Sequence, residues 1–119
     1  EKVDPHALGD YWKDAVERLL RACVRDRDVL PADQSTDIRF HEFMADDLAT
    51  VERVYALAGQ PFDDRARAAM AEFLATHERG RHGTVVYDLA ALGLDETERR
   101  DALAFYVDAF GVAWEGGRA

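Results

Sequence analysis

The chain has 119 residues, of which 48% are hydrophobic and 10% aromatic, and its formal net charge at pH 7 is −9. This length suits one ordinary domain, and a chain so rich in apolar residues does not belong to the disordered class. The negative charge argues against nucleic acid or an anionic membrane as a general partner, because both need a cationic surface. A site for an anion must therefore be local.

Cysteine content and apolar runs indicate the compartment. Cys23 is the only cysteine, so an internal disulfide and a cysteine-rich zinc site are excluded, and a reducing, cytoplasmic location is expected. Cys23 lies among apolar residues at helical spacing, which predicts a small core side chain. No apolar run approaches the length of a membrane span, and Glu1 does not open a signal peptide. Because the sequence begins without methionine, we expect further residues upstream.

The first predicted element is a long amphipathic helix from Pro5 to about Val29. Asp4 is a suitable N-cap, and Pro5 occupies a first-turn position where its missing N–H costs nothing. Pro31 closes the segment. Apolar residues recur at steps of three and four and form one stripe. They are Leu8, Trp12, Ala15, Val16, Leu19, Cys23 and Val24.

The next segment, Ser35–Phe40, alternates in polarity and predicts one short strand. Ile38 and Phe40 fall on one side and Asp37 on the other. The only comparable run is Thr84–Tyr87, which is brief and follows a glycine. A lone strand leaves its backbone groups unpaired. We therefore expect the partner strands to lie outside this sequence or in another copy of the chain.

Two helices with aspartate caps are predicted after a connector over residues 41–45. The first runs from about Asp47 to Ala58, with Asp46 as its cap and Gly59 at its end. The second begins at Asp63 or Asp64 and continues to about Thr76. The acidic pairs 46–47 and 63–64 each open a helix, where carboxylates satisfy backbone N–H groups. We assign them to capping and not to acid–base chemistry.

A last helix is predicted from the capping-box-like sequence Asp95-Glu96-Thr97-Glu98, and Gly111 ends it. It is the fourth helix of the chain. The remaining residues, 112–119, form a loose tail unless the indole of Trp114 docks on another surface.

One stretch of this acidic chain suits an anion: residues 78–87, with the sequence ERGRHGTVVY. Arg79, Arg81 and His82 lie among Gly80 and Gly83. Arginine presents a planar fork of donors to anionic oxygens, and glycine lets backbone N–H groups approach closely. Taken by itself, the composition favours a solvated connection between helices, with a phosphate site as the second interpretation.

Other chemistries find less support in the sequence. His77 and His82 flank the same loop, but Gly80 would interrupt a helical two-histidine metal pattern and the arginines would repel a cation. We expect no metal. Ser35 is the only serine, and neither a Gly-x-Ser-x-Gly turn nor a Gly-x-x-x-x-Gly-Lys-Ser/Thr loop occurs. We assign no catalytic residue, so any catalysis must be completed elsewhere.

Longer stretches of the sequence point to a family. Phe40-His41-Glu42-Phe43 is similar to a Tyr-Glu-x-Leu segment, and Asp46-Asp47-Leu48-Ala49-Thr50-Val51 is similar to Asp-Pro-Leu-x-Thr-Val. With the loop into Tyr87-Asp88-Leu89 and Gly93-Leu94-Asp95, they resemble the C-terminal third of bacterial sulfotransferases of the actinobacterial type. The likeness runs from about Tyr11 to Val112.

The resemblance assigns a role to the cationic loop. Arg81-His82-Gly83 is similar to the Arg-Lys-Gly element that holds the 3′-phosphate of the sulfuryl donor, 3′-phosphoadenosine 5′-phosphosulfate (PAPS). It implies that Arg81 pairs with the phosphate and that His82 stands where lysine is common. Gly83 would supply a backbone N–H, and Arg79 a second positive charge.

The resemblance also implies a fold and a partner. The chain would be a mostly α-helical fragment, about four helices plus one short strand, of an α/β P-loop-like sulfotransferase fold with a central parallel sheet. The loop that binds the 5′-phosphosulfate and the catalytic base would lie in an N-terminal part outside Glu1–Ala119. We expect the 119-residue piece alone to be inactive, and the complete enzyme to sulfate a hydroxyl or amine of a small-molecule acceptor.

Two alternatives stay open from the residues. The chain could be a freestanding helical interaction module that forms a homodimer through its apolar faces and pairs its strand with a second copy. It could also be a fragment of another phosphate-handling enzyme.

Overall fold

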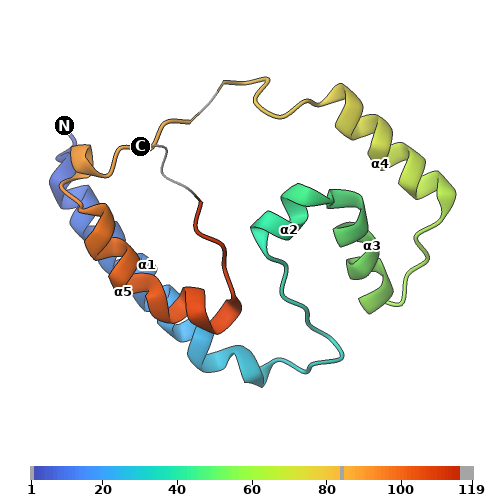
Figure 1. The fold of residues 1–119 in the computed structure, drawn as a ribbon, viewed down its shortest axis with the longest axis horizontal. Coiled ribbons are helices and arrows are strands. Elements are labelled where there is room, and N and C mark those ends of the chain that lie inside the picture. Colours follow the sequence, from blue (N-terminus) through green and yellow to red (C-terminus); the bar gives the residue numbers. More distant parts are fainter. Residues whose placement is uncertain (1, 84, 116–119) are drawn as a thin grey trace. The chain divides into compact units, whose positions relative to one another are not determined.

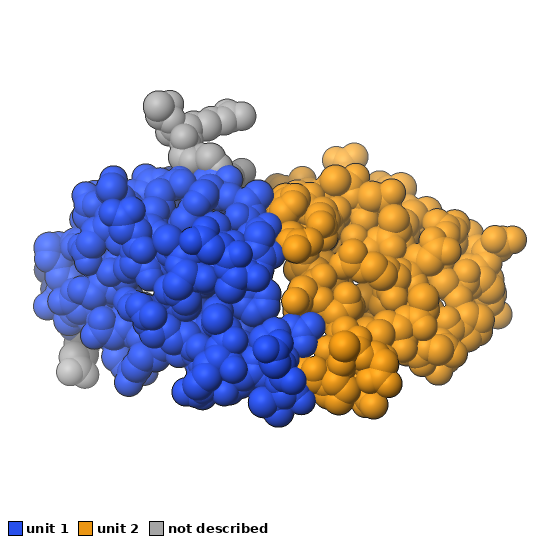
Figure 2. All heavy atoms as spheres, turned by 60° about the horizontal axis from the view of Figure 1, so that its bottom comes forward, with its two compact units in different colours: residues 1–29, 86–119 blue, residues 30–85 orange. Residues whose placement is uncertain are grey.

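The computed structural model in Figure 1 describes residues 2–83 and 85–115. Within these residues the regular structure is helical. The chain divides into two units, residues 1–29 with 86–119 and residues 30–85 (Figure 2). The elements are α1 (Pro5–Asp26), η1 (Arg27–Val29), α2 (Phe40–Ala45), α3 (Asp47–Leu57), α4 (Asp64–Thr76), η2 (Ala90–Leu92) and α5 (Glu96–Phe110), where η marks a 3₁₀ helix.

Four helices begin at the aspartates that the sequence predicted as caps. Asp4 accepts hydrogen bonds from the N–H groups of His6 and Ala7 at 3.0 and 3.3 Å. The carboxylate of each of the other three aspartates accepts one hydrogen bond, from the N–H group three residues further along the chain, at 2.8 to 2.9 Å. These are Asp46 in α3, Asp63 in α4 and Asp95 in α5. Each cap satisfies an N–H group that the first helical turn leaves unpaired, which confirms the predicted starts.

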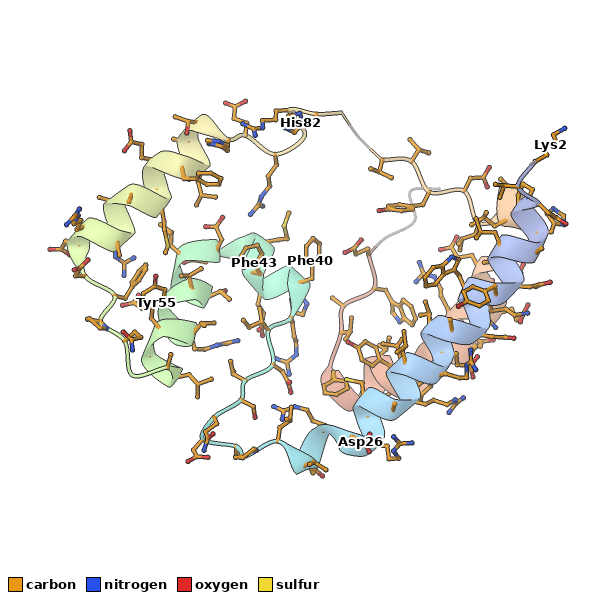
Figure 3. All side chains as sticks on the ribbon, turned by 180° about the vertical axis from the view of Figure 1, so that it is seen from behind. Lys2, Asp26, Phe40, Phe43, Tyr55 and His82 are labelled. Atoms are coloured by element: carbon orange, nitrogen blue, oxygen red, sulfur yellow. The ribbon has the colours of Figure 1, made fainter. Side chains whose placement is uncertain are left out.

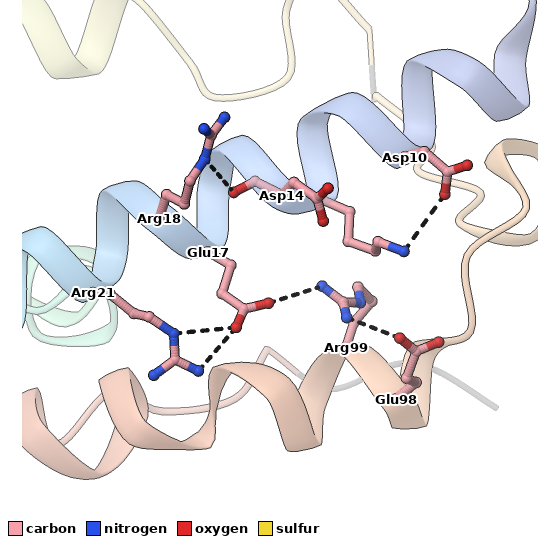
Figure 4. Close-up of polar contacts among 8 residues, drawn as sticks. Asp10, Asp14, Glu17, Arg18, Arg21, Glu98 and Arg99 are labelled. Atoms are coloured by element: carbon pink, nitrogen blue, oxygen red, sulfur yellow. Dashed lines mark hydrogen bonds and ion pairs between the residues drawn. The ribbon is translucent and has the colours of Figure 1, made fainter.

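In the first unit, α1 lies along α5 and against η2 (Figure 1). Gly9 is buried at this contact, because a Cβ added to it would lie 2.3 Å from the backbone oxygen of Leu92. Glu17 and Arg99 connect α1 with α5 by an ion pair of 3.8 Å between Oε2 and Nη1 (Figure 4). The guanidinium of Arg21 lies 4.3 Å above the ring of Phe105. A glycine thus allows the close approach of α1 to η2, and charged side chains connect α1 with α5.

The described end of the chain also belongs to this unit. The guanidinium of Arg100 lies 4.9 Å from the centre of the Trp114 ring. Trp12, Leu103 and Trp114 help to line an open hollow of about 760 Å³. Trp114 of the predicted tail therefore contacts α5, whereas residues 116–119 lie outside the described residues.

In the second unit, α3 packs against α2 and α4. Tyr55 of α3 meets Phe62 edge to face at 5.1 Å, and the guanidinium of Arg67 lies 4.9 Å from the same ring. Arg67 also pairs with Glu52 at 2.7 Å. An open apolar groove of about 460 Å³ lies beside these contacts, and both Phe43 of α2 and Tyr55 border it (Figure 3).

The predicted strand over residues 35–40 is wrong. Residues 35–39 have no regular secondary structure, and Phe40 already begins α2. Arg39 is extended, with φ −83° and ψ 135°, but a strand also requires a backbone ladder, and the part of the chain described here supplies none. Within the rival run, Thr84 lies outside the described residues.

The predicted connector over residues 41–45 is helical, so the described chain has five α-helices instead of about four. The N–H of Phe43 donates to the carbonyl oxygen of Arg39 at 3.0 Å. The side chains of Arg39 and Glu42 pair at 3.0 Å across one helical turn. The sequence did not predict this helix, because polarity alternates over the preceding residues and Phe40 fits both a strand face and a helix start.

No apolar side chain among the described residues is buried. On α1, Trp12 and Leu19 are 53% and 65% exposed, and Phe73 of α4 is 57% exposed. Cys23 is exposed too, so its predicted core position is wrong. The packing within each described unit therefore leaves large parts of these side chains accessible. Of the described helices, none combines the length and the apolar character that crossing a membrane requires.

Candidate functional site

The cationic loop follows α4 and consists of two overlapping tight turns. The N–H of Arg81 donates to the carbonyl oxygen of Glu78 at 3.4 Å, and that of Gly83 donates to Gly80 at 2.9 Å. Gly80 and Gly83 have φ values of 80° and 97°, a region that glycine enters without steric cost. A Cβ at either position would meet no atom within 4 Å, so backbone conformation, and not lack of space, requires glycine here.

Arg81 and His82 interact directly on this turn. The Nε–H of Arg81 donates to Nε2 of His82 at 2.9 Å, and both side chains are exposed. Because Nε of arginine only donates, Nε2 of the histidine must be without a proton. The two Nη groups of Arg81 have no hydrogen-bond partner within the described ranges, and the side chain is exposed, which leaves a planar pair of donors available.

Arg79 lies on the same loop but is tied to another helix. Its Nη2 donates to Oδ2 of Asp47 at 3.1 Å, with side chains that are 52% and 23% exposed. Asp47 is the first residue of α3, and its Oδ1 accepts from the N–H of Leu48 at 2.9 Å. The loop is thereby connected to the start of α3, within the second unit.

Asp47 is the residue of this site that the sequence did not identify. We assigned it to capping together with Asp46, but Asp46 caps α3 and Asp47 binds Arg79. A signal was present, because one helix start needs a single N-cap carboxylate and two adjacent aspartates leave one available. Its partner could not be chosen from the sequence, since 32 positions separate the two residues.

The predicted site residues are therefore placed as follows. Arg81 and His82 come together, and Arg79 faces Asp47. The N–H of Gly83 points into the loop to Gly80, so a ligand would have to share this donor or take it over. His77 is set apart from them by its stacking on Phe73 at 3.9 Å, at the end of α4.

Such an arrangement can bind an anion. Two guanidinium groups, an imidazole and a glycine turn offer charge-assisted and backbone hydrogen bonds to phosphate oxygens. Over the ranges that the structure describes, no three side chains of His, Cys, Asp or Glu gather as ligands of a metal ion.

Comparison with known proteins adds the family. The model of the sulfotransferase family matches residues 2–64, which include α1, α2, α3 and the first residue of α4. The match contains Asp47 and ends before the cationic loop. No curated protein and no solved structure matches the chain. Because the family model covers more than half of the 119 residues, this chain belongs to the sulfotransferase family.

Proposed function

We propose that this chain is the C-terminal part of a PAPS-dependent sulfotransferase and that the loop of residues 78–83 binds the 3′-phosphate of the donor. The complete enzyme transfers a sulfuryl group from PAPS to a hydroxyl or amine of a small-molecule acceptor. It releases adenosine 3′,5′-bisphosphate and the proton of the acceptor. The 5′-phosphosulfate loop and the catalytic base belong to the N-terminal part, so residues 1–119 alone do not transfer sulfate.

The observation that carries the binding role is the exposed Arg81–His82 pair on a turn shaped by two glycines. A phosphate monoester has nearly two negative charges and three acceptor oxygens at neutral pH. The Nη groups of Arg81 match two of those oxygens in a bidentate contact. Arg79 brings a second positive charge from the same loop.

The exposed apolar faces support the proposed position within a larger enzyme. A domain of about this length normally covers the apolar stripes of its helices with a sheet or other helices. Here Trp12 of α1 and Phe73 of α4 are more than half exposed. A central parallel sheet from the N-terminal part would cover such faces.

Calorimetric titration with adenosine 3′,5′-bisphosphate tests the binding role in the full-length enzyme. Arg81→Ala should weaken binding about ten- to hundredfold, the range of a charge-assisted hydrogen bond. Arg65→Ala is the matched control, because Arg65 is an exposed arginine of α4 outside the loop. Equal affinities of wild type and Arg81→Ala would remove Arg81 from the site.

Light scattering on the 119-residue chain tests what covers the apolar faces. A severed part of an enzyme should be poorly folded or aggregate, because its apolar surfaces find no specific partner. A compact dimer that unfolds cooperatively without nucleotide would instead identify a second copy as the cover and support a freestanding module.

A further inference from the structure

We propose that Asp47 is a built-in counter-ion that weakens phosphate binding at the cationic loop and thereby speeds the release of adenosine 3′,5′-bisphosphate. This role rests on the proposed function of the loop. The observation behind it is the contact between Nη2 of Arg79 and Oδ2 of Asp47 at 3.1 Å, which connects the loop to the first residue of α3.

The carboxylate is held in place from its own helix. Oδ1 of Asp47 accepts the N–H of Leu48 at 2.9 Å, so the second oxygen presents a fixed acceptor to Arg79. The side chain of Asp47 is 23% exposed and that of Arg79 is 52% exposed. The acid is thus the sheltered partner, and the guanidinium is the one that a ligand can reach.

This pairing affects a bound phosphate in two opposite ways. Asp47 accepts one N–H of Arg79 and leaves the remaining N–H donors of the guanidinium available. The contact also fixes the direction in which these donors point. It also sets a negative charge beside the cation that a phosphate has to approach, and the phosphate has nearly two charges of the same sign. The repulsion acts on both of these charges, whereas the orientation concerns one partly exposed side chain. The net effect of Asp47 is therefore to lower affinity.

Weaker binding has a use in a transferase. The bisphosphate leaves with the same 3′-phosphate with which PAPS enters, so a site that holds this group too tightly retains the product. Product release limits turnover in many enzymes. Differences in affinity between variants of one site arise mainly in the dissociation rate. A counter-ion beside Arg79 shortens the residence of the product.

The test is the dissociation rate of adenosine 3′,5′-bisphosphate from the full-length enzyme, measured by stopped flow, with affinity measured by calorimetry. Asp47→Asn keeps the size of the side chain and an oxygen for the N–H of Leu48, and removes the charge. It should bind about two- to fivefold more tightly, with slower release by the same factor. The gain should shrink at high salt, because salt screens exposed charges.

Two variants make the result specific. Asp64→Asn is the matched control, because Asp64 is likewise the first residue of its helix, α4, but contacts no arginine among the described residues. It should leave affinity unchanged. In an Arg79→Ala background, Asp47→Asn should lose its gain, since the paired cation is gone. Asp47→Ser, with a hydroxyl for the Leu48 N–H, should reproduce the tighter binding if Asn disturbs the helix.

The outcomes separate this inference from the proposed function. Unchanged or weaker binding by Asp47→Asn and Asp47→Ser, with a wild type that still depends on Arg81, would overturn the counter-ion role and leave the phosphate loop standing. A gain that persists without Arg79 would also overturn it. A wild-type enzyme that does not bind the bisphosphate at all would remove both.

Discussion

The side chains of Arg81 and His82 are joined by a hydrogen bond of 2.9 Å from Nε of the arginine to Nε2 of the histidine. This bond exists only while Nε2 carries no proton. Protonation of the imidazole would break it and place a second positive charge beside Arg81. A lysine at the same position could not accept such a bond, because its ammonium group only donates.

The first prediction follows from this pair. Nε2 of His82 is without a proton in this hydrogen bond, whereas a lysine at position 82 would bring a full positive charge to the loop. In the full-length enzyme, His82→Lys should therefore bind adenosine 3′,5′-bisphosphate about three- to tenfold more tightly than wild type at about pH 8. Calorimetry of both proteins at this pH measures the difference.

The ratio of the two affinities is the quantity to follow. Equal affinities of wild type and His82→Lys would place His82 away from the bound phosphate.

Gly9 gives a second prediction, about stability. In an exposed helix interior, Gly→Ala normally stabilises by about 0.5–1 kcal/mol. At Gly9 the added Cβ would lie 2.3 Å from the backbone oxygen of Leu92, which cannot rotate away as a side chain could. Gly9→Ala should therefore lower the free energy of unfolding by about 1–3 kcal/mol, measured by urea denaturation. Stabilisation by this variant would show that α1 and η2 do not approach so closely.

The sequence predicted those parts of the fold that depend on neighbouring residues. Asp4, Asp63 and Asp95 act as caps where expected, since a cap and its N–H groups lie within three residues of each other. Gly59 and Gly111 end their helices with φ values of 65° and 61°. The strand was wrong for the opposite reason. Strand formation depends on a distant partner, which the alternation of Ile38 and Phe40 does not reveal.

In the candidate site, too, local features could be predicted from the sequence and contacts between distant residues could not. The cationic loop could be found from its composition, because Arg81 and His82 are adjacent and the glycines mark turns. The pairing of Arg79 with Asp47 could not, because 32 positions separate the two residues and other carboxylates were equally eligible. The direction of the Gly83 N–H toward Gly80 is also a result of the turn geometry and not of composition.

A third prediction concerns the titration of Asp26. Arg25 donates Nε and Nη2 to its two oxygens at 2.6 Å. This hydrogen bonding lowers the pKa of Asp26 below its usual value; desolvation opposes it, and the positive charge of Arg25 adds a smaller lowering effect. A carboxyl group with a lowered pKa in the folded state stabilises the fold at any pH above its usual pKa. This stability is lost as the pH falls through the folded-state pKa. Both side chains are more than half exposed, so direct NMR titration of the carboxyl carbon is the sensitive measurement. Arg25→Gln should return the pKa toward its usual value, and an unchanged pKa would show that the pair does not form.

The last prediction separates the two aspartates that open α4. Asp63 Oδ1 accepts the N–H of Ala66 at 2.8 Å, whereas Asp64 is already the first helical residue. Asp63→Ala leaves that N–H without its partner and should lower stability by about 1 kcal/mol, as measured by thermal unfolding of the full-length protein. Asp63→Ser should restore most of the loss, because its hydroxyl can also cap the helix. Asp64→Ala should cost less, since it removes only a favourable interaction with the helix dipole. Equal losses at positions 63 and 64 would mean that charge near the helix start, and not the specific cap, stabilises α4.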